Sequence, residues 1–253
     1  MCSFSDLDVR YIPNHENILK EIHRLGYRNV ALTALTDDTK AIPKFTFSNP
    51  FNDLNILKRL NINLKNQCLQ KFESGWLRYN YQYYDLVSVL PFTEKELNNA
   101  LNSDFVNIIL FDNTNEHLIF TLKGSCVNIA RSRSIYFNIS YSMLLEGNYT
   151  TSAVKILNKL AHSFNGKDQL IISSGTQNEL EFRSPLELYS MLLCCGFDAK
   201  YAKKLFSVNS YECMQASYHK RHSGSVLQYT SFHKVENEDG DELEPEKKKS
   251  KMM

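Results

Sequence analysis

The sequence predicts an α/β fold whose parallel sheet is either open or closed into a barrel. Short apolar runs with the composition of buried strands alternate along the chain with segments of helical spacing. A length of 253 residues suits one α/β barrel or two small domains. An apolar fraction of 43% is enough for a substantial core.

Strands are expected where short apolar runs occur or where apolar and polar residues alternate. These segments are Phe4–Val9, Asn29–Leu32, Ile56–Leu64, Asp85–Leu90, Val106–Phe111, Ile135–Ser140 and Leu170–Ile172. The last run is entirely apolar, as is typical of a central parallel strand. The polar stretch 36–49 predicts a loop, and 67–83 is ambiguous.

Helices are expected between these strands, with recognisable ends. They cover Glu16–Leu25, Thr93–Leu101, Cys126–Arg131 and Thr150–Phe164. Gly26 ends the first, and Thr93 with Glu96 has capping-box spacing. Ser184, Pro185 and Glu187 predict a further helix that begins with an N-cap serine and a proline at its first position. Gly196 ends that helix, and Asp198 begins another.

Polar residues stand where two predicted strands would reach the rim of a barrel. Ser173 and Ser174 follow the last strand, with neither histidine nor carboxylate beside them, which suggests binding without acid–base chemistry. Asp6 and Asp8 are two residues apart, so on a regular strand they share a face and could hold a metal. The alternative is that they accept backbone N–H groups or pair with a base such as Arg59.

Basic residues near predicted strand ends and loops are candidates for phosphate contacts. The candidate RNA-binding residues are Lys58, Arg59, Arg78, Arg131, Arg133 and Arg183. Aromatic residues lie close to several of them in sequence, a combination that suits contacts with RNA. The alternative for each is an ordinary solvated surface. Arg183 precedes a helix N-terminus, where anions are favoured, although a pair with Glu179 or Glu181 is the simpler interpretation.

The C-terminal tail differs in composition from the rest. The formal net charge is +1, but 236–246 is mostly acidic and 247–251 basic, so the remainder is positive. Apolar residues are sparse from Val235, which predicts a barrel domain at 1–234 and a disordered tail at 235–253. We expect neither a signal peptide nor a membrane span. No GxGxxG, P-loop or nucleophile-elbow motif occurs, and no catalytic set is convincing.

Several motifs together resemble the roughly 30-kDa protein subunit of ribonuclease P and ribonuclease MRP. The matching pieces, in order, are FSDLDVR, HRLGYRNVALT, ILKRLNI, YDLVSVLPFTEKELNNA, FNISYSMLL and ISSGTQNELEFRSPLELYSMLLCCGFDAKYAKKLFSVN. They extend from Phe4 to about Met214, whereas the loops 36–55 and 113–126 match poorly. That family is similar to the barrels of the polymerase-and-histidinol-phosphatase (PHP) type, so the resemblance implies a TIM-barrel-like fold.

The resemblance also implies a function without catalysis by the protein. Metal-dependent PHP barrels carry HxH after the first strand and DxH near the last. Here these positions read Asp6-Leu7-Asp8 and Ser174-Gly175-Thr176, so we expect no catalytic metal and no other cofactor. In the family, RNA carries the catalysis. The protein is implied to bind that RNA and the other protein subunits, in the nucleus and nucleolus, and to support 5′ maturation of precursor tRNA and processing of ribosomal RNA.

Two other classes of function remain open at this stage. One is a metal-dependent phosphoesterase of the PHP type, which would require tightly bound metal and histidine ligands. The other is a protein-only interaction barrel, which would lack the salt-dependent RNA affinity of the first reading.

Overall fold

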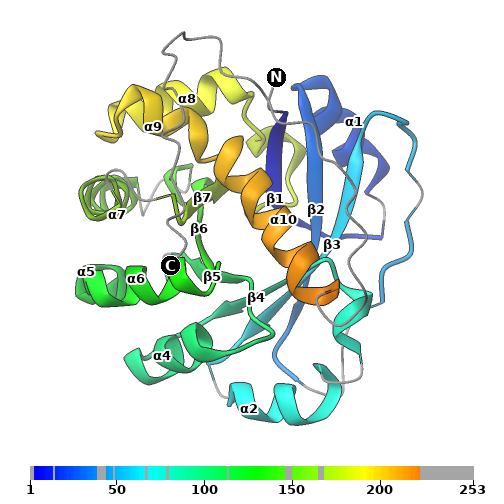
Figure 1. The fold of residues 1–253 in the computed structure, drawn as a ribbon. Helices are drawn as coiled ribbons and strands as arrows, with labels where there is room; N and C mark the ends of the chain where they lie inside the picture. Colours follow the sequence, from blue (N-terminus) through cyan, green and yellow to red (C-terminus); the bar gives the residue numbers. More distant parts are fainter. Residues whose placement is uncertain are drawn as a thin grey trace, which may run out of the picture.

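The computed structural model describes residues 3–13, 15–38, 44–47, 49–65, 68–77, 80–112, 114–145, 150–164 and 168–222. The tail expected to be disordered and the candidate Arg78 both lie outside these residues. Within them, strands and helices alternate along the chain around one sheet, as predicted (Figure 1).

The sheet has seven strands in sequential order, and every neighbouring pair is parallel. The strands are β1 (Phe4–Arg10), β2 (Tyr27–Thr36), β3 (Asn55–Asn63), β4 (Leu86–Leu90), β5 (Ile108–Phe111), β6 (Tyr136–Ser140) and β7 (Leu170–Ser173). All the predicted strands are present. β2 is longer at both ends than predicted, because its flanking residues pair with β1 and β3.

Backbone contacts bring the two edges of the sheet together. The N–H of Gly175 donates to the carbonyl of Asp8 at 2.8 Å, and the N–H of Arg10 donates to the carbonyl of Thr176 at 2.9 Å. The sheet is therefore a nearly closed barrel. Gly175 adopts a φ of +71°, and a Cβ there would collide with the side chain of Ser140, so the closure requires glycine.

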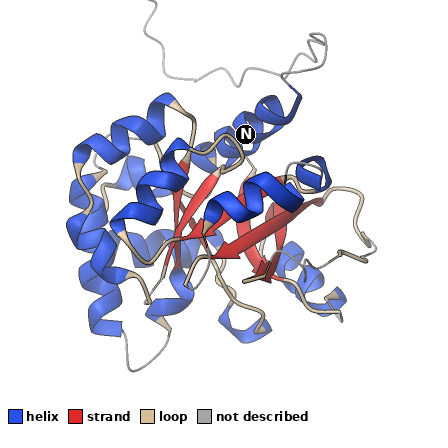
Figure 2. Ribbon diagram, turned by 90° about the horizontal axis from the view of Figure 1, so that it is seen from below, coloured by secondary structure: helices blue, strands red, loops and turns tan. Residues whose placement is uncertain are grey.

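The longer helices lie outside the barrel and cover the strands (Figure 2). They are α1 (Glu16–Arg24), α4 (Glu94–Asn102), α6 (Gly124–Ser132), α7 (Thr150–Ser163) and α8 (Pro185–Cys194). The shorter elements are α2 (Leu69–Phe72), η1 (Glu73–Leu77), η2 (Tyr81–Tyr83), α5 (Glu116–Thr121), η3 (Tyr141–Leu144), η4 (Glu179–Glu181) and α9 (Ala199–Lys204). The ambiguous stretch 67–83 is thus a series of short turns of helix. No helix among the described residues is long and apolar enough to cross a membrane.

Both predicted capping boxes are present. The hydroxyl of Thr93 accepts from the N–H of Glu96, and the hydroxyl of Ser184 accepts from the N–H of Glu187. Each glutamate returns a bond to the N-cap backbone N–H, so two otherwise unpaired donors are satisfied at each helix start.

Helix α10 (Val208–His222) closes one end of the barrel and was not predicted as a separate helix (Figure 1). Its Cys213 and Met214 pack against a small core of inward-pointing residues from the first halves of the strands. That core contains Leu7, Ala31, Leu86, Ile108, Tyr136 and Ile171. The helix also bonds strand starts directly: Asn209 donates to the carbonyl of Leu170 at 2.8 Å. α10 therefore lies across the N-terminal end of the barrel.

Candidate nucleic-acid interface

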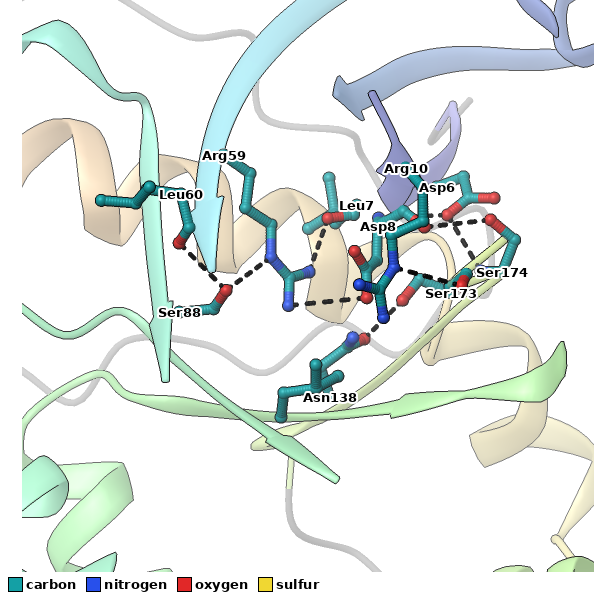
Figure 3. A network of polar contacts seen from close by, with 12 residues as sticks. Asp6, Leu7, Asp8, Arg10, Arg59, Leu60, Ser88, Asn138, Ser173 and Ser174 are labelled. Atoms are coloured by element: carbon teal, nitrogen blue, oxygen red, sulfur yellow. Dashed lines mark hydrogen bonds and ion pairs between the residues drawn. The ribbon is translucent and has the colours of Figure 1, made fainter. Parts of the chain in front are cut away.

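The interior of the barrel is apolar at the end closed by α10 and polar further along the strands. The polar part contains Arg59 from β3, Ser88 from β4, Asn138 from β6 and Ser173 from β7, all buried. Asp8 from β1 joins them (Figure 3).

Arg59 occupies the centre of this interior and is completely buried. Its Nε donates to the hydroxyl of Ser88 at 2.9 Å, and its Nη1 donates to the carbonyl of Leu7 at 2.6 Å. Its Nη2 lies 3.8 Å from the carboxylate of Asp8, which is also buried (Figure 3). Burial lowers the pKa of the guanidinium, and the carboxylate of Asp8 opposes that shift. The prediction that Arg59 contacts RNA is therefore wrong for this structure, because the side chain reaches no surface.

The two aspartates of β1 do not share a face, contrary to the prediction. Asp6 pairs with Val30 of β2 and Val9 pairs with Leu32, so two residues of β1 stand opposite Ala31 alone. This bulge shifts the alternation by one residue. The carboxylate of Asp8 points toward Arg59, whereas that of Asp6 points toward Ser174 (Figure 3).

Asp6 forms part of the contact between the two edges of the sheet. Its Oδ1 accepts from the N–H of Ser174 at 3.1 Å and from the N–H of Asp8 at 3.2 Å. The hydroxyl of Ser174 donates to the carbonyl of Asp8 at 3.1 Å. Burial raises the pKa of Asp6 to about 6, although its hydrogen bonds oppose the shift. The alternative that this aspartate accepts backbone N–H groups is confirmed.

The residues expected at the rim are in fact buried beneath it. Asp6, Asp8, Ser173 and Ser174 are each at most 1% exposed. The accessible rim includes two hollows of about 510 and 440 Å³ that share Arg10. Their other polar lining includes Thr33, Asn61, Asn63, Lys65 and Thr176. The Nε of Arg10 donates to the carbonyl of Gly175 at 3.2 Å, so this arginine belongs to the edge contact and not to a separate site.

The polar interior does not fit a catalytic transition metal. Asp8 faces a guanidinium, and its other neighbours are amides and hydroxyls (Figure 3). Throughout the described segments, no three His, Cys, Asp or Glu side chains converge as metal ligands. Imidazole and thiolate are the ligands such metals favour. None of the polar residues around Arg59 is a histidine, and burial raises the pKa of the Cys213 thiol far above its usual range, so the thiolate is disfavoured.

Cations gather instead at the N-terminal end of the barrel, around the last turn of α10. Arg221 donates to the carbonyl of Tyr84 and contacts the carboxylate of Asp85 at 3.1 Å. The same Asp85 accepts from the backbone N–H of Lys58 at 2.8 Å, which places Lys58 beside Arg221. The Nζ of Lys58 lies 4.5 Å from the centre of the Tyr83 ring, a partly exposed aromatic.

Arg133 joins the same end from the loop before β6. It pairs with Asp104 at 2.5 Å and donates to the carbonyl of Asn102 at 3.1 Å. Lys220 of α10 donates to the carbonyl of Val106 at 2.9 Å, and its pKa is lowered by burial and then by the nearby charge of Arg133. We call Lys58, Arg131, Arg133, Lys220 and Arg221 the basic end.

Among the predicted cations that the structure describes, Arg131 is the one whose side chain is exposed. It ends α6 and donates from Nε to the side-chain oxygen of Gln169 at 3.2 Å, just before β7 begins. The structure thus brings three predicted residues to one end of the barrel, and adds Lys220 and Arg221. The basic run His219–His222 was a signal in the sequence, but its relevance depended on α10 crossing the barrel.

Arg183 lies apart from the basic end, in the connection after β7. Its Nη1 donates to the carbonyls of Leu180 and Phe182, and its own carbonyl accepts from the hydroxyl of Tyr27 at 2.9 Å. No ion pair with Glu179 or Glu181 is found within the described chain. The helix start beside it is already occupied, because the carboxylate of Glu187 accepts from the N–H of Ser184 at 2.7 Å.

The fold and these side chains define an α/β barrel of the TIM type with cations concentrated at the N-terminal end of its strands. The family model for RNase P subunit p30 matches residues 3–222. The chain therefore belongs to this family of ribonuclease P protein subunits, and the resemblance drawn from its motifs is confirmed.

Two individual relatives are similar over more than half of the chain. Ribonuclease P protein subunit p30 of Mus musculus is 25% identical over 233 residues, covering 83% of this chain and 84% of the relative. Protein GAMETOPHYTE DEFECTIVE 1 of Arabidopsis thaliana is 30% identical over 151 residues, or 60% of this chain. The chain spans only 24% of that plant protein's length.

A solved structure shows the same fold. A chain in the cryo-EM structure of archaeal ribonuclease P with mature tRNA superposes with a TM-score of 0.67. The match covers 92% of this chain and 99% of the archaeal chain at 14% identity. The expectation of a TIM-barrel-like fold is thus confirmed.

Proposed function

We propose that this chain is a non-catalytic protein subunit of the ribonuclease P particle that holds the catalytic RNA against its basic end. Its partners would be that RNA and other protein subunits. The reaction supported is 5′ maturation of precursor tRNA, and in the related ribonuclease MRP particle the processing of ribosomal RNA. The particle would act in the nucleus and nucleolus.

One observation carries this proposal: five cations from three segments, namely β3, the end of α6 and α10, converge on one end of the barrel. Two carboxylates, Asp85 and Asp104, are in contact with them, so the group keeps an excess of positive charge. Lysine and arginine bind RNA mainly through phosphates. Tyr83 beside Lys58 adds an aromatic face on which a base could stack.

The basic end is also held in place before any RNA arrives. Arg133 donates to the carbonyl of Asn102 at the end of α4, and Lys220 and Arg221 donate to backbone carbonyls just before β5 and β4. Such contacts reduce the number of rotamers available to a long side chain, and less entropy is lost when a phosphate binds.

The experiment has a matched pair of variants. Lys58, Arg131 and Arg133 are changed together to alanine in one protein. Three exposed lysines of α4 and α7, namely Lys95, Lys155 and Lys159, are changed together in the control. Both variants lose three positive charges, so a difference between them reports position and not net charge.

The readout is the affinity for the RNA that copurifies with the tagged wild-type chain, measured over a range of salt. The basic-end variant should bind at least tenfold more weakly, and its slope of log K against log salt should fall by about two units, at ~0.7–0.9 per phosphate contact. The control should keep the wild-type slope. Equal losses in both variants, or copurification of no structured RNA with the wild type, would contradict the proposal.

A further inference from the structure

Helix α8 is apolar on the side that faces solvent. Leu188 and Leu192 fill its inner face and are at most 1% exposed. On the outer face Leu186 is 74% exposed and Leu193 is 39% exposed. A surface helix usually carries polar residues there, and a helix that is apolar all round is normally covered on both sides.

The exposed residues form a stripe beside a groove. Leu186, Tyr189 and Leu193 are three and four residues apart, so they share one side of the helix. A groove of about 550 Å³ runs alongside, lined by Leu186, Tyr189, Leu25 at the end of α1, Phe4 at the start of β1, and Phe206 after α9. Leu180, which is 84% exposed, stands shortly before the helix.

Some charged side chains near the groove are paired within the chain, and one is not. The carboxylate of Glu187 is held by Ser184 in the capping box, and that of Glu21 is bonded by Arg24 at 2.6 Å. Lys203 lines the groove, and in the described part of the chain it has no carboxylate partner. The groove therefore presents apolar surface with an unneutralised cation at its edge.

We propose that this face of α8 binds a protein subunit of the same particle through a helical segment that is apolar on one side and acidic at its edge. Apolar residues of that segment would cover Leu186, Tyr189 and Leu193, and a carboxylate would pair with Lys203. RNA fits poorly, because leucine side chains offer neither charge nor a stacking plane to a nucleotide.

Charge and composition also argue against two other occupants of the groove, namely a second copy of the chain and its own acidic stretch. A second copy docked on the same face by two-fold symmetry would repeat the cation of Lys203 without supplying a carboxylate. The acidic stretch 236–246 of this chain has the required charge, but Leu243 is its sole large apolar residue. The second copy therefore lacks the carboxylate, and the acidic stretch lacks the apolar stripe.

The test places a photoactivatable cross-linking residue at position 186 of the full-length chain, in particles purified by a tag on the RNA. A matched probe replaces Phe120 of α5, which is 50% exposed and far from α8 in sequence. The probe at 186 should cross-link to another protein subunit, at a peptide with apolar residues at helical spacing and an aspartate or glutamate nearby. The probe at 120 should not give that product.

A second measurement uses substitutions. Leu186→Glu should lower recovery of that subunit in the particle at least fivefold, whereas Phe120→Glu should leave it unchanged. Both variants should melt like the wild type, since both side chains are exposed. Lys203→Glu should lower recovery too, and by less.

Four results would overturn the inference: a cross-link to RNA, to a second copy or to residues 236–246, or full subunit recovery with Leu186→Glu. The inference rests on the proposed function, but a failure of the inference can be distinguished from a failure of that function. Loss of RNA copurification by the wild-type chain would remove the proposed function, whereas failure at α8 would leave the salt-dependent RNA binding intact.

Discussion

Arg59 shows how a buried cation can hold a barrel interior together. Its guanidinium donates to a hydroxyl and a carbonyl, and its charge is opposed by the buried carboxylate of Asp8 at 3.8 Å. A buried pair of this kind contributes little net stability, but losing one partner typically costs about 3–5 kcal/mol, because the other charge is left alone. The pair therefore fixes the interior arrangement more than it strengthens the fold.

Asp6 makes stability depend on pH, because its pKa is about 6 in the folded protein, above the 3.8 of an exposed aspartate. The folded state binds this proton more tightly than the unfolded state. The contribution is thus complete below about pH 4 and is lost as pH rises through about 6, with a total of ~3 kcal/mol for this shift.

Asp6→Asn should abolish this pH dependence while its side-chain oxygen still accepts from Ser174. Relative to the variant, the wild type should lose ~2 kcal/mol of unfolding free energy between pH 4.5 and pH 7.5. Urea denaturation of both proteins across this range measures the difference. Glu179→Gln, at an exposed carboxylate, is the control and should track the wild type. A constant difference between wild type and Asp6→Asn at every pH would show that Asp6 does not titrate in this range.

At the scale of single elements, local signals in the sequence were sufficient for the strands and the capped helices. Thr93 with Glu96 and Ser184 with Glu187 satisfy helix N-termini within one turn, and no distant residue is needed. Apolar runs such as Leu170–Ile172 are likewise buried whatever the order of the strands.

The site was less predictable because it depends on closure of the sheet. In β3 the apolar Leu60 and Ile62 alternate with Arg59 and Asn61, a pattern that normally indicates a strand with one face in water. Closure turns that polar face inward, so Arg59 is buried. The bulge in β1 and the path of α10 also result from contacts between distant segments. Neither can be predicted from the spacing of residues in the sequence.

The edge contact of the barrel should be sensitive to a single methyl group at Gly175. Alanine there would need a φ of +71° and would collide with Ser140. We expect Gly175→Ala to cost roughly 2 kcal/mol or more of unfolding free energy. Gly124, the first residue of α6, has no atom within 4 Å of an added Cβ. Gly124→Ala should therefore be neutral or stabilising by up to ~1 kcal/mol, and equal effects of the two substitutions would contradict the proposed role of Gly175.

At the scale of the whole molecule, the proposed function moves the binding surface from the C-terminal end of the barrel to its N-terminal end. Barrel enzymes build their sites at the C-terminal ends of the strands. Here that end leads to a buried arginine–carboxylate pair, and the cations of the basic end lie at the opposite end with α10. The same fold can thus present a binding surface in place of a reaction centre.

This arrangement predicts that the folded barrel does not depend on a divalent metal. A metal ion inside would face the guanidinium of Arg59, and electrostatic repulsion between two cations is strong where solvent is excluded. EDTA should leave the melting temperature of the purified chain unchanged, and equimolar Zn²⁺ or Mn²⁺ should not raise it. Elemental analysis should find these metals well below one equivalent.

Asp8→Asn separates the two explanations for a carboxylate in this position. If Asp8 serves only Arg59, the variant should be about 3–5 kcal/mol less stable than the wild type. This difference should be the same with and without EDTA. If Asp8 held a metal, EDTA would destabilise the wild type, and the variant would no longer respond to it. If EDTA lowers the melting temperature of the wild type but not that of Asp8→Asn, Asp8 binds a metal. That result would contradict a purely structural role of Asp8 and would indicate a metal site toward the C-terminal end of the barrel.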